Sequence, residues 1–208
     1  MPDRQAPMVT GGVSATAGAC ETAVMNPTIH DDPLPYAETL PERAADEVVR
    51  VVIHCTELPD LATAREYGEK VVHASGTGNS GHYYIDRDGA IHRYVPGTRI
   101  ANHVRGHNPY SIGIELVNLG RYPDWQDSRH QQMTEPYPEA QIDALRSLLT
   151  HLRGEFPKLR EITGHEELDT AMVPASDAPD RQVRRKLDPG PCFPWDAIVP
   201  ACGLERLR

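Results

Sequence analysis

Glu47-Val48-Val49-Arg50-Val51-Val52-Ile53-His54 is a nearly continuous run of β-branched residues. Such a run is typical of a strand that is buried on both faces in the middle of a sheet. His54 stands at the end of this run, where strands open into a cleft. The sequence therefore predicts a central strand over residues 47–54 with a histidine at its end.

Two further predicted strands also carry or precede polar residues suited to chemistry. Residues 111–118 alternate, with apolar side chains on one face and Glu115 on the other. A carboxylate flanked in this way belongs either to a functional site or to the solvent-facing side of an edge strand. Residues 159–163 form a second run, which leads directly into Gly164 and His165. The sequence thus places Glu115 on one strand and His165 just after another.

Two amphipathic helices are expected between and after these strands. Asp60 is suited to cap a helix over residues 61–72, with Val71 and Val72 on its buried side. Residues 138–154 predict a longer helix, and its buried stripe consists of Ile142, Leu145, Leu148, Leu149 and Leu152.

A hairpin completes the pattern. Residues 82–86 and 90–95 are two β-rich runs, and the turn sequence Asp88-Gly89 lies between them. Strands that alternate with helices are typical of layered folds that contain both. We therefore predict an α/β (α+β) fold class: a single domain with a mixed central β-sheet flanked by helices.

The bulk properties limit the classes of protein to consider. A chain of 208 residues is long enough for one domain with a sizeable core. Residues 1–35 lack periodicity and are expected to form a flexible N-terminal extension to a domain over residues 36–208. The formal net charge of -9 argues against a nucleic-acid partner. No run approaches the ~20 apolar residues of a membrane span, and the N-terminus lacks a secretory core. A cytoplasmic protein is therefore expected, with a periplasmic or exported protein as the alternative.

The cysteines leave two possibilities open. Cys20, Cys55, Cys192 and Cys202 include no Cys-x-x-Cys pair, which argues against a zinc ribbon. Cys192 and Cys202 are close enough in sequence to close a short disulfide loop, and free thiols fit the sequence equally well.

His54 and His165 stand out among the ten histidines because each ends a predicted strand. With Asp188 they offer two imidazoles and one carboxylate, which leave one tetrahedral position of a zinc ion open, as in hydrolytic sites. Asp169, four residues after His165, is the alternative third ligand. A Cys-His dyad is disfavoured because Cys55 follows His54 directly, so that on a strand the two side chains point to opposite faces.

Six segments, in order over about residues 48–197, resemble one known family. They are Val52–Thr56 (VIHCT), Ser80–Gly89 (SGHYYIDRDG), Ala101–His103 (ANH), Asn108–Leu116 (NPYSIGIEL), Thr163–His165 (TGH), and Arg185–Pro191 (RKLDPGP) with Phe193–Trp195 (FPW). Together they resemble the type 2 N-acetylmuramoyl-L-alanine amidases, which share a fold with peptidoglycan recognition proteins and phage amidase-type lysozymes.

The resemblance implies roles for individual residues. Zinc would be held by His54, His165 and Asp188. Glu115 would take a proton from water and pass it to the leaving amine, while Lys186 would stabilise the oxyanion. The candidate substrate-binding residues are His103, Tyr83 and Asn108.

The activity implied by the resemblance is the zinc-dependent hydrolysis of one amide of peptidoglycan. This amide joins the lactyl group of N-acetylmuramic acid, or of its anhydro form, to L-alanine of the stem peptide. The partners would be peptidoglycan fragments or murein, in degradation or recycling of the cell wall. A non-catalytic muropeptide-binding protein and a zinc peptidase are the alternatives. Residues 166–185 are longer than the usual link of the family, and form either a lid or groove wall or a surface insertion.

Overall fold

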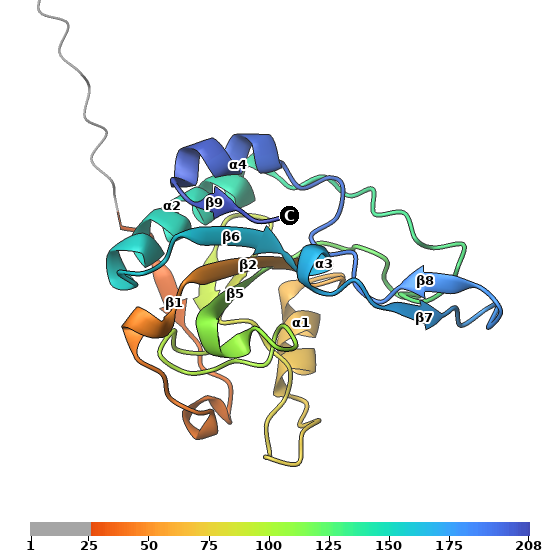
Figure 1. Ribbon diagram of the computed structural model, residues 1–208, viewed down its shortest axis with the longest axis horizontal. Coiled ribbons are helices and arrows are strands. Elements are labelled where there is room, and N and C mark those ends of the chain that lie inside the picture. Colours follow the sequence, from red (N-terminus) through yellow and green to blue (C-terminus); the bar gives the residue numbers. More distant parts are fainter. Residues whose placement is uncertain (1–25) are drawn as a thin grey trace, which may run out of the picture.

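The computed structural model describes residues 26–208, which form a seven-stranded sheet with helices on both faces (Figure 1). In order across the sheet, the strands are β1 (Ile29–Asp31), β4 (Ile91–Arg93), β3 (Tyr83–Ile85), β5 (Ser111–Leu116), β2 (Arg50–Cys55), β6 (Glu161–Gly164) and β9 (Glu205–Arg206). Neighbouring strands are parallel except for β3 and β4, which form the antiparallel hairpin expected from the sequence. The mixed sheet flanked by helices confirms the predicted fold class.

Within the described residues, four α-helices and a small second sheet surround this central sheet. The helices are α1 (Leu61–Glu69), α2 (Glu139–Glu155), α3 (His165–Leu168) and α4 (Trp195–Cys202), with 3-10 turns at Ala37–Thr39, Ala45–Glu47 and Asn108–Tyr110. The second sheet pairs β7 (Met172–Pro174) with β8 (Gln182–Arg184) in an antiparallel hairpin. None of the described helices combines the length and the apolar composition that crossing a membrane requires.

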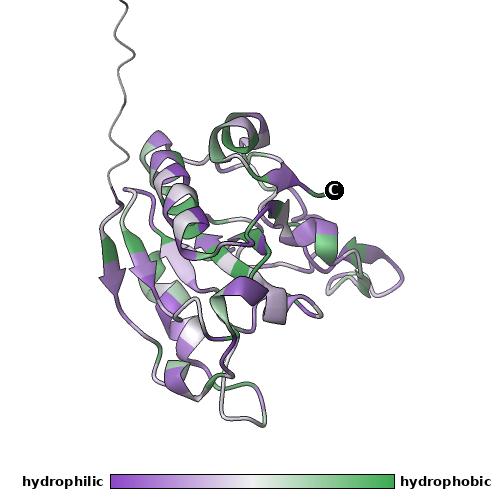
Figure 2. Ribbon diagram, turned by 60° about the vertical axis from the view of Figure 1, so that its left-hand side comes forward, coloured by the Kyte–Doolittle hydropathy of each residue, from purple (hydrophilic) through white to green (hydrophobic). Residues whose placement is uncertain are grey.

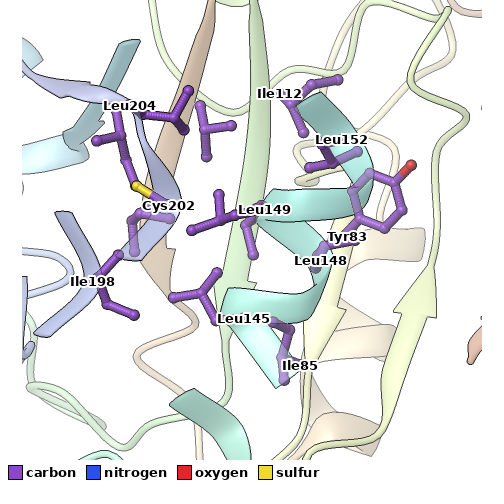
Figure 3. Packing of buried hydrophobic residues seen from close by; sticks show 14 of the residues in the cluster. Tyr83, Ile85, Ile112, Leu145, Leu148, Leu149, Leu152, Ile198, Cys202 and Leu204 are labelled. Carbon is purple, nitrogen blue, oxygen red and sulfur yellow. The ribbon is translucent and has the colours of Figure 1, made fainter. Parts of the chain in front are cut away.

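The main hydrophobic core lies between the sheet and the helices α2 and α4 (Figure 3). The predicted stripe of α2 is buried there, because its apolar residues recur on one side of the helix. Hydrophilic residues alternate with the apolar ones along this helix, as the hydropathy colours show (Figure 2). From the sheet, Ile53 of β2 and Ile112 and Ile114 of β5 point into this core.

The alternate residues of the same strands point to the opposite face, since side chains alternate along a strand. His54 and Glu115 lie on this second face, and they are register partners in the parallel pair β2 and β5. Helix α1 covers part of this face through a smaller core cluster that includes Ala64, Leu58 and Tyr84. The sheet thus separates the main core from the face that carries the candidate chemistry.

The predicted flexible extension is wrong at its C-terminal end. Ile29–Asp31 form β1, whose backbone pairs with β4, and Leu34 is buried. Arg93 also donates two hydrogen bonds to the Asp31 carboxylate, at 2.7 and 2.6 Å. These contacts attach residues 29–34 to the domain, while the rest of the predicted extension, residues 1–25, lies outside the described residues.

Helix α1 begins where predicted but ends earlier. Asp60 caps it by accepting a hydrogen bond from the backbone N–H of Thr63 at 2.7 Å. The helix ends at Glu69, so Val71 and Val72 lie outside it, and both are exposed rather than buried.

The proposed disulfide is not formed. Among residues 26–208, Cys55, Cys192 and Cys202 are all free thiols. Cys20 lies outside the described residues.

Candidate active site

Three side chains from distant parts of the chain meet beside the C-terminal ends of the parallel strands β2 and β6. His54 lies near the end of β2, and His165 directly follows the neighbouring parallel strand β6. Asp188 comes from the loop after β8. The His54 Nδ1 and His165 Nδ1 atoms are 3.0 Å apart, and each is 3.0 Å from Asp188 Oδ2. These three buried residues form a group that can hold a metal ion, and they are the three predicted from the sequence.

The geometry of this trio fits a divalent cation. Bonds of about 2.0–2.1 Å to a tetrahedral ion place neighbouring donor atoms about 3.3 Å apart, close to the 3.0 Å separations seen here. The second carboxylate oxygen of Asp188 is buried and has no hydrogen-bond partner among residues 26–208. A buried carboxylate needs a compensating charge, which a bound cation would supply.

The charge states of His54 and Asp188 also favour metal binding. Burial, reinforced by the nearby His165, lowers the pKa of His54 to about 4, so its imidazole is neutral at neutral pH. Burial opposes ionisation of Asp188, but the charges of His165 and Lys186 and hydrogen bonds from both histidines hold its pKa well below the usual range. Neutral imidazole and ionised carboxylate are the forms that bind metal.

Asp169, the alternative third ligand, lies outside the trio. Its Oδ2 is 4.0 Å from Nε2 of His165, on the side of the imidazole opposite to the trio. The same carboxylate forms an ion pair with Arg185. The structure therefore brings Asp188, and not Asp169, next to both imidazoles.

Glu115 and Lys186, the two predicted catalytic residues, line the cleft beside the trio. The Oε1 atom of Glu115 is 3.9 Å from Nδ1 of His54. Burial, together with the charge of Asp188, raises the pKa of Glu115 well above the usual range. Burial opposes the charge of Lys186, but the carboxylates of Asp188, Glu57 and Glu115 raise its pKa, so it stays a cation. The site thus combines a carboxyl group that can exchange a proton with a fixed positive charge.

The cleft has a volume of about 530 Å³, large enough for a ligand of several residues. Its walls come from helix α1, the loop before β3, the segment around His103 and the insertion over residues 166–185. Two residues of that insertion, Asp169 and Arg185, line the cleft directly. The sequence left two interpretations of residues 166–185, a lid or groove wall and a surface insertion. The structure supports the groove wall.

His103 and Asn108, two of the three predicted substrate-binding residues, also line the cleft. Nδ1 of His103 lies 3.0 Å from Nε2 of His54. The side-chain oxygen of Asn108 accepts hydrogen bonds from the backbone N–H groups of His103 and Val104, at 3.1 and 2.7 Å. Both residues therefore have contacts within the protein as well as a position in the cleft.

Tyr83, the third predicted substrate-binding residue, does not face the cleft. Its side chain is fully buried in the main core, next to Leu148 and Leu152 of α2 (Figure 3). The adjacent Tyr84 lines the cleft instead, with its hydroxyl 3.2 Å from Oγ of Ser80. Adjacent side chains on a strand point to opposite faces, so Tyr84, and not Tyr83, faces the cleft.

A buried ion pair beside the site was not anticipated from the sequence. Arg121 forms two hydrogen bonds with Glu57, at 2.7 and 2.9 Å, just beyond the end of β2. It also donates to the backbone carbonyls of Arg184 and Arg185, at 2.9 and 3.3 Å. Arg121 thus ties the segment before Lys186 to the strand that carries His54.

An open metal-binding trio at the ends of parallel strands, beside a buried carboxyl group and a lysine, is typical of a metal-dependent hydrolase. Residues 44–191 match the sequence model of the family Amidase_2, described as N-acetylmuramoyl-L-alanine amidase. The match covers well over half of the chain, and the chain belongs to this family.

Individual relatives are similar in sequence to parts of this chain. The 1,6-anhydro-N-acetylmuramyl-L-alanine amidase AmpD of Enterobacter cloacae is 33% identical over 120 residues, which cover 53% of this chain and 50% of that protein. The chain therefore spans about half the length of the AmpD proteins it matches.

Solved structures of similar proteins agree with the fold. The N-acetylmuramoyl-L-alanine amidase LysC from Clostridium intestinale URNW superposes with a TM-score of 0.62 over 86% of this chain and 99% of that chain. At 19% identity this likeness shows the fold alone. AmiD from E. coli, in complex with the substrate anhydro-N-acetylmuramic acid-L-Ala-D-gamma-Glu-L-Lys, has a TM-score of 0.59 and 25% identity. That match covers 79% of this chain and 61% of the AmiD chain.

Proposed function

We propose that this protein is a zinc-dependent N-acetylmuramoyl-L-alanine amidase. It would hydrolyse the amide between the lactyl group of N-acetylmuramic acid, or anhydro-N-acetylmuramic acid, and L-alanine of the stem peptide. The observation that carries this proposal is the convergence of the trio His54, His165 and Asp188 with Glu115 and Lys186 in one cleft. Membership of the amidase family supports the same activity.

Zinc is the ion that this donor set favours. Two imidazole nitrogens and one carboxylate oxygen suit a tetrahedral zinc ion with its remaining position open to solvent or substrate. When bound, zinc would polarise a water molecule and the scissile carbonyl group. The trio would hold it through Nδ1 of both histidines and Oδ2 of Asp188.

We assign to Glu115 the movement of the proton that hydrolysis requires. Its raised pKa brings the carboxyl group closer to neutrality, where one group can both accept and donate a proton. It would take the proton of the attacking water and deliver it to the nitrogen of the leaving L-alanine. Lys186, which stays a cation, would stabilise the negative charge that develops on the carbonyl oxygen.

The relatives favour an anhydro-muropeptide as the substrate. AmpD is named for the 1,6-anhydro sugar, and AmiD was solved with an anhydro-N-acetylmuramic acid peptide. Release of the stem peptide from such fragments would serve peptidoglycan recycling. The cytoplasmic location stays a prediction, because the N-terminal residues on which it rests lie outside the described part of the chain.

The test compares two substrates by mass spectrometry of the products. Purified protein is incubated with anhydro-muropeptides and, separately, with intact sacculi. We expect a free stem peptide whose N-terminus is L-alanine, loss of product after chelation, and recovery when zinc is added back. Cleavage between amino acids would identify a peptidase instead. Binding of the muropeptide to the zinc-loaded protein without any turnover would identify a non-catalytic binding protein.

A further inference from the structure

We propose that Arg121 is a positioning residue for Lys186: its guanidinium holds the backbone from which the Lys186 side chain enters the cleft. Arg121 does not line the cleft itself, so it acts on the reaction through Lys186 and not by contact with the substrate. This inference rests on the proposed function, in which Lys186 stabilises the negative charge on the carbonyl oxygen. It gives the buried pair of Arg121 and Glu57 a task beyond stability.

No hydrogen bond or ion pair fixes the ammonium of Lys186 among residues 26–208. The carboxylates of Asp188, Glu57 and Glu115 attract it through space only. A lysine side chain is a compact charge on a flexible four-carbon stem. The place of this charge in the cleft therefore depends closely on the backbone that carries the side chain.

That backbone belongs to the loop that follows β8. The N–H group of Arg185 donates a hydrogen bond to the carbonyl of Ala171, at 2.9 Å. The carbonyls of Arg184 and Arg185 accept hydrogen bonds from the guanidinium of Arg121, at 2.9 and 3.3 Å. Arg121 thus holds the two peptide groups that immediately precede Lys186.

Every N–H group of the Arg121 guanidinium has an acceptor in this arrangement. Arginine offers five such groups. Two of them bind the Glu57 carboxylate, at 2.7 and 2.9 Å, and one binds the side-chain oxygen of Gln131, at 3.2 Å. The remaining two bind the carbonyls before Lys186. A lysine at this position has only three N–H groups, so it would leave at least two of these acceptors without a donor.

Glu57, the anchor of Arg121, has an unusual backbone conformation. Its φ of 49° lies in the left-handed region, and no other residue except glycine has a positive φ among residues 26–208. The carbonyl of Glu57 accepts a hydrogen bond from Nε1 of Trp125 at 3.0 Å, and a Cβ atom on Gly120 would lie 2.6 Å from Cγ of Glu57. Such conformations persist only where the surrounding contacts enforce them, and they are frequent at functional sites. The fold thus fixes Glu57, and through it Arg121, beside the end of β2.

A double-mutant cycle on the amidase reaction tests this inference, with an anhydro-muropeptide as substrate. Arg121→Lys should lower kcat by about 10²-fold, because a displacement of a catalytic group by about 1 Å can cost this much, while KM changes little. In a Lys186→Ala background the same substitution should have no further effect on kcat, because no ammonium remains to be positioned. A purely structural role would instead lower kcat by the same factor in both backgrounds.

Hydrogen exchange of the metal-free protein gives a readout that needs no activity. The peptides that cover residues 182–187 should exchange faster in Arg121→Lys, as measured by mass spectrometry. Zinc affinity, from competition with a chelator, should stay close to that of the unsubstituted protein. The reason is that the backbone carbonyl of Asp188 has its own hydrogen bond, donated by the N–H group of Glu166 at 3.0 Å.

Arg50→Lys is the matched control. Arg50 forms an ion pair with Glu161 through two hydrogen bonds, at 3.0 and 2.8 Å, and joins the strands β2 and β6. This pair lies where both strands begin, at the end away from the trio, and neither residue lines the cleft. Its substitution should leave both kcat and the exchange of residues 182–187 unchanged.

A second variant covers the case in which Arg121→Lys does not fold, as judged by circular dichroism. The double substitution Glu57→Gln with Arg121→Met then replaces it, because it leaves no buried charge without a partner. It should show the same loss of kcat and the same faster exchange.

The outcomes separate this inference from the proposed function. A folded Arg121→Lys protein with unchanged kcat would overturn the inference, and so would equal factors in the two backgrounds of the cycle. A loss of zinc binding that accounts for the loss of activity would also overturn it. If the unsubstituted, zinc-loaded protein shows no turnover, the proposed function fails instead. In that case faster exchange of residues 182–187 in Arg121→Lys would still support the role of Arg121, and unchanged exchange would overturn it.

Discussion

Lowering the pH of the metal-free protein should lower its free energy of unfolding, because His54 is neutral in the folded protein. In the folded protein, burial lowers the pKa of His54 to about 4, whereas the ordinary value is 6.5. Between these two values the unfolded chain binds a proton that the folded chain does not bind. The stability contributed by His54 is therefore fully present above pH 6.5 and is lost as the pH falls toward 4.

The size of the effect follows from the shift. One pKa unit corresponds to about 1.4 kcal/mol, so the shift of His54 amounts to about 3 kcal/mol over this pH range. Burial also lowers the pKa values of His82 and His103 well below the usual range, which adds to the loss of stability on acidification. Glu115 acts in the opposite direction, because its raised pKa stabilises the fold at low pH and this contribution is lost as the pH rises. Asp188, whose pKa is held well below the usual range, also loses its stabilising contribution at low pH, so we expect the three imidazoles and this carboxylate to outweigh Glu115 and give a net loss of stability on acidification.

The assay is urea unfolding of chelator-treated protein at a series of pH values, followed by circular dichroism. The matched variant is His54→Gln, which removes the titrating ring and should remove up to about 3 kcal/mol of the pH dependence. A stability that stays constant or rises from pH 6.5 toward 4 would refute the reasoning. An equally steep dependence in His54→Gln would show that the assigned residue is not responsible.

Three further predictions concern the site and its support. Glu115→Gln should lower kcat by about 10²–10⁴-fold while zinc affinity stays close to that of the unsubstituted protein, and an unchanged kcat would exclude Glu115 as the proton carrier. Asp188→Ala should lose zinc during gel filtration whereas Asp169→Ala retains it, as measured by metal analysis, and the reverse result would exchange their roles. Arg121→Met leaves Glu57 buried without its partner, which should cost about 3–5 kcal/mol of unfolding free energy in urea; a loss under about 1 kcal/mol would show that the pair has little weight.

The sheet and the two histidines of the trio could be predicted because local patterns determine them. The β-branched run before His54 and the alternation around Glu115 both indicate strands whose side chains are buried against the rest of the fold. Neighbouring parallel strands end on the same side of the sheet. His165, which follows β6, therefore lies next to His54, near the end of β2. Hydrophobic periodicity therefore predicted the main core and the positions of His54 and His165, whereas Asp188, which lies in a loop, was assigned through the family resemblance.

Features that depend on partners distant in the sequence could not be predicted in this way. Strand β1 has three residues, of which only Ile29 is even partly buried, so it has no periodic signal and depends on pairing with β4. The pair of Glu57 and Arg121 joins residues 64 positions apart, and neither side chain has a pattern that identifies the other. These contacts exist only after the sheet has formed.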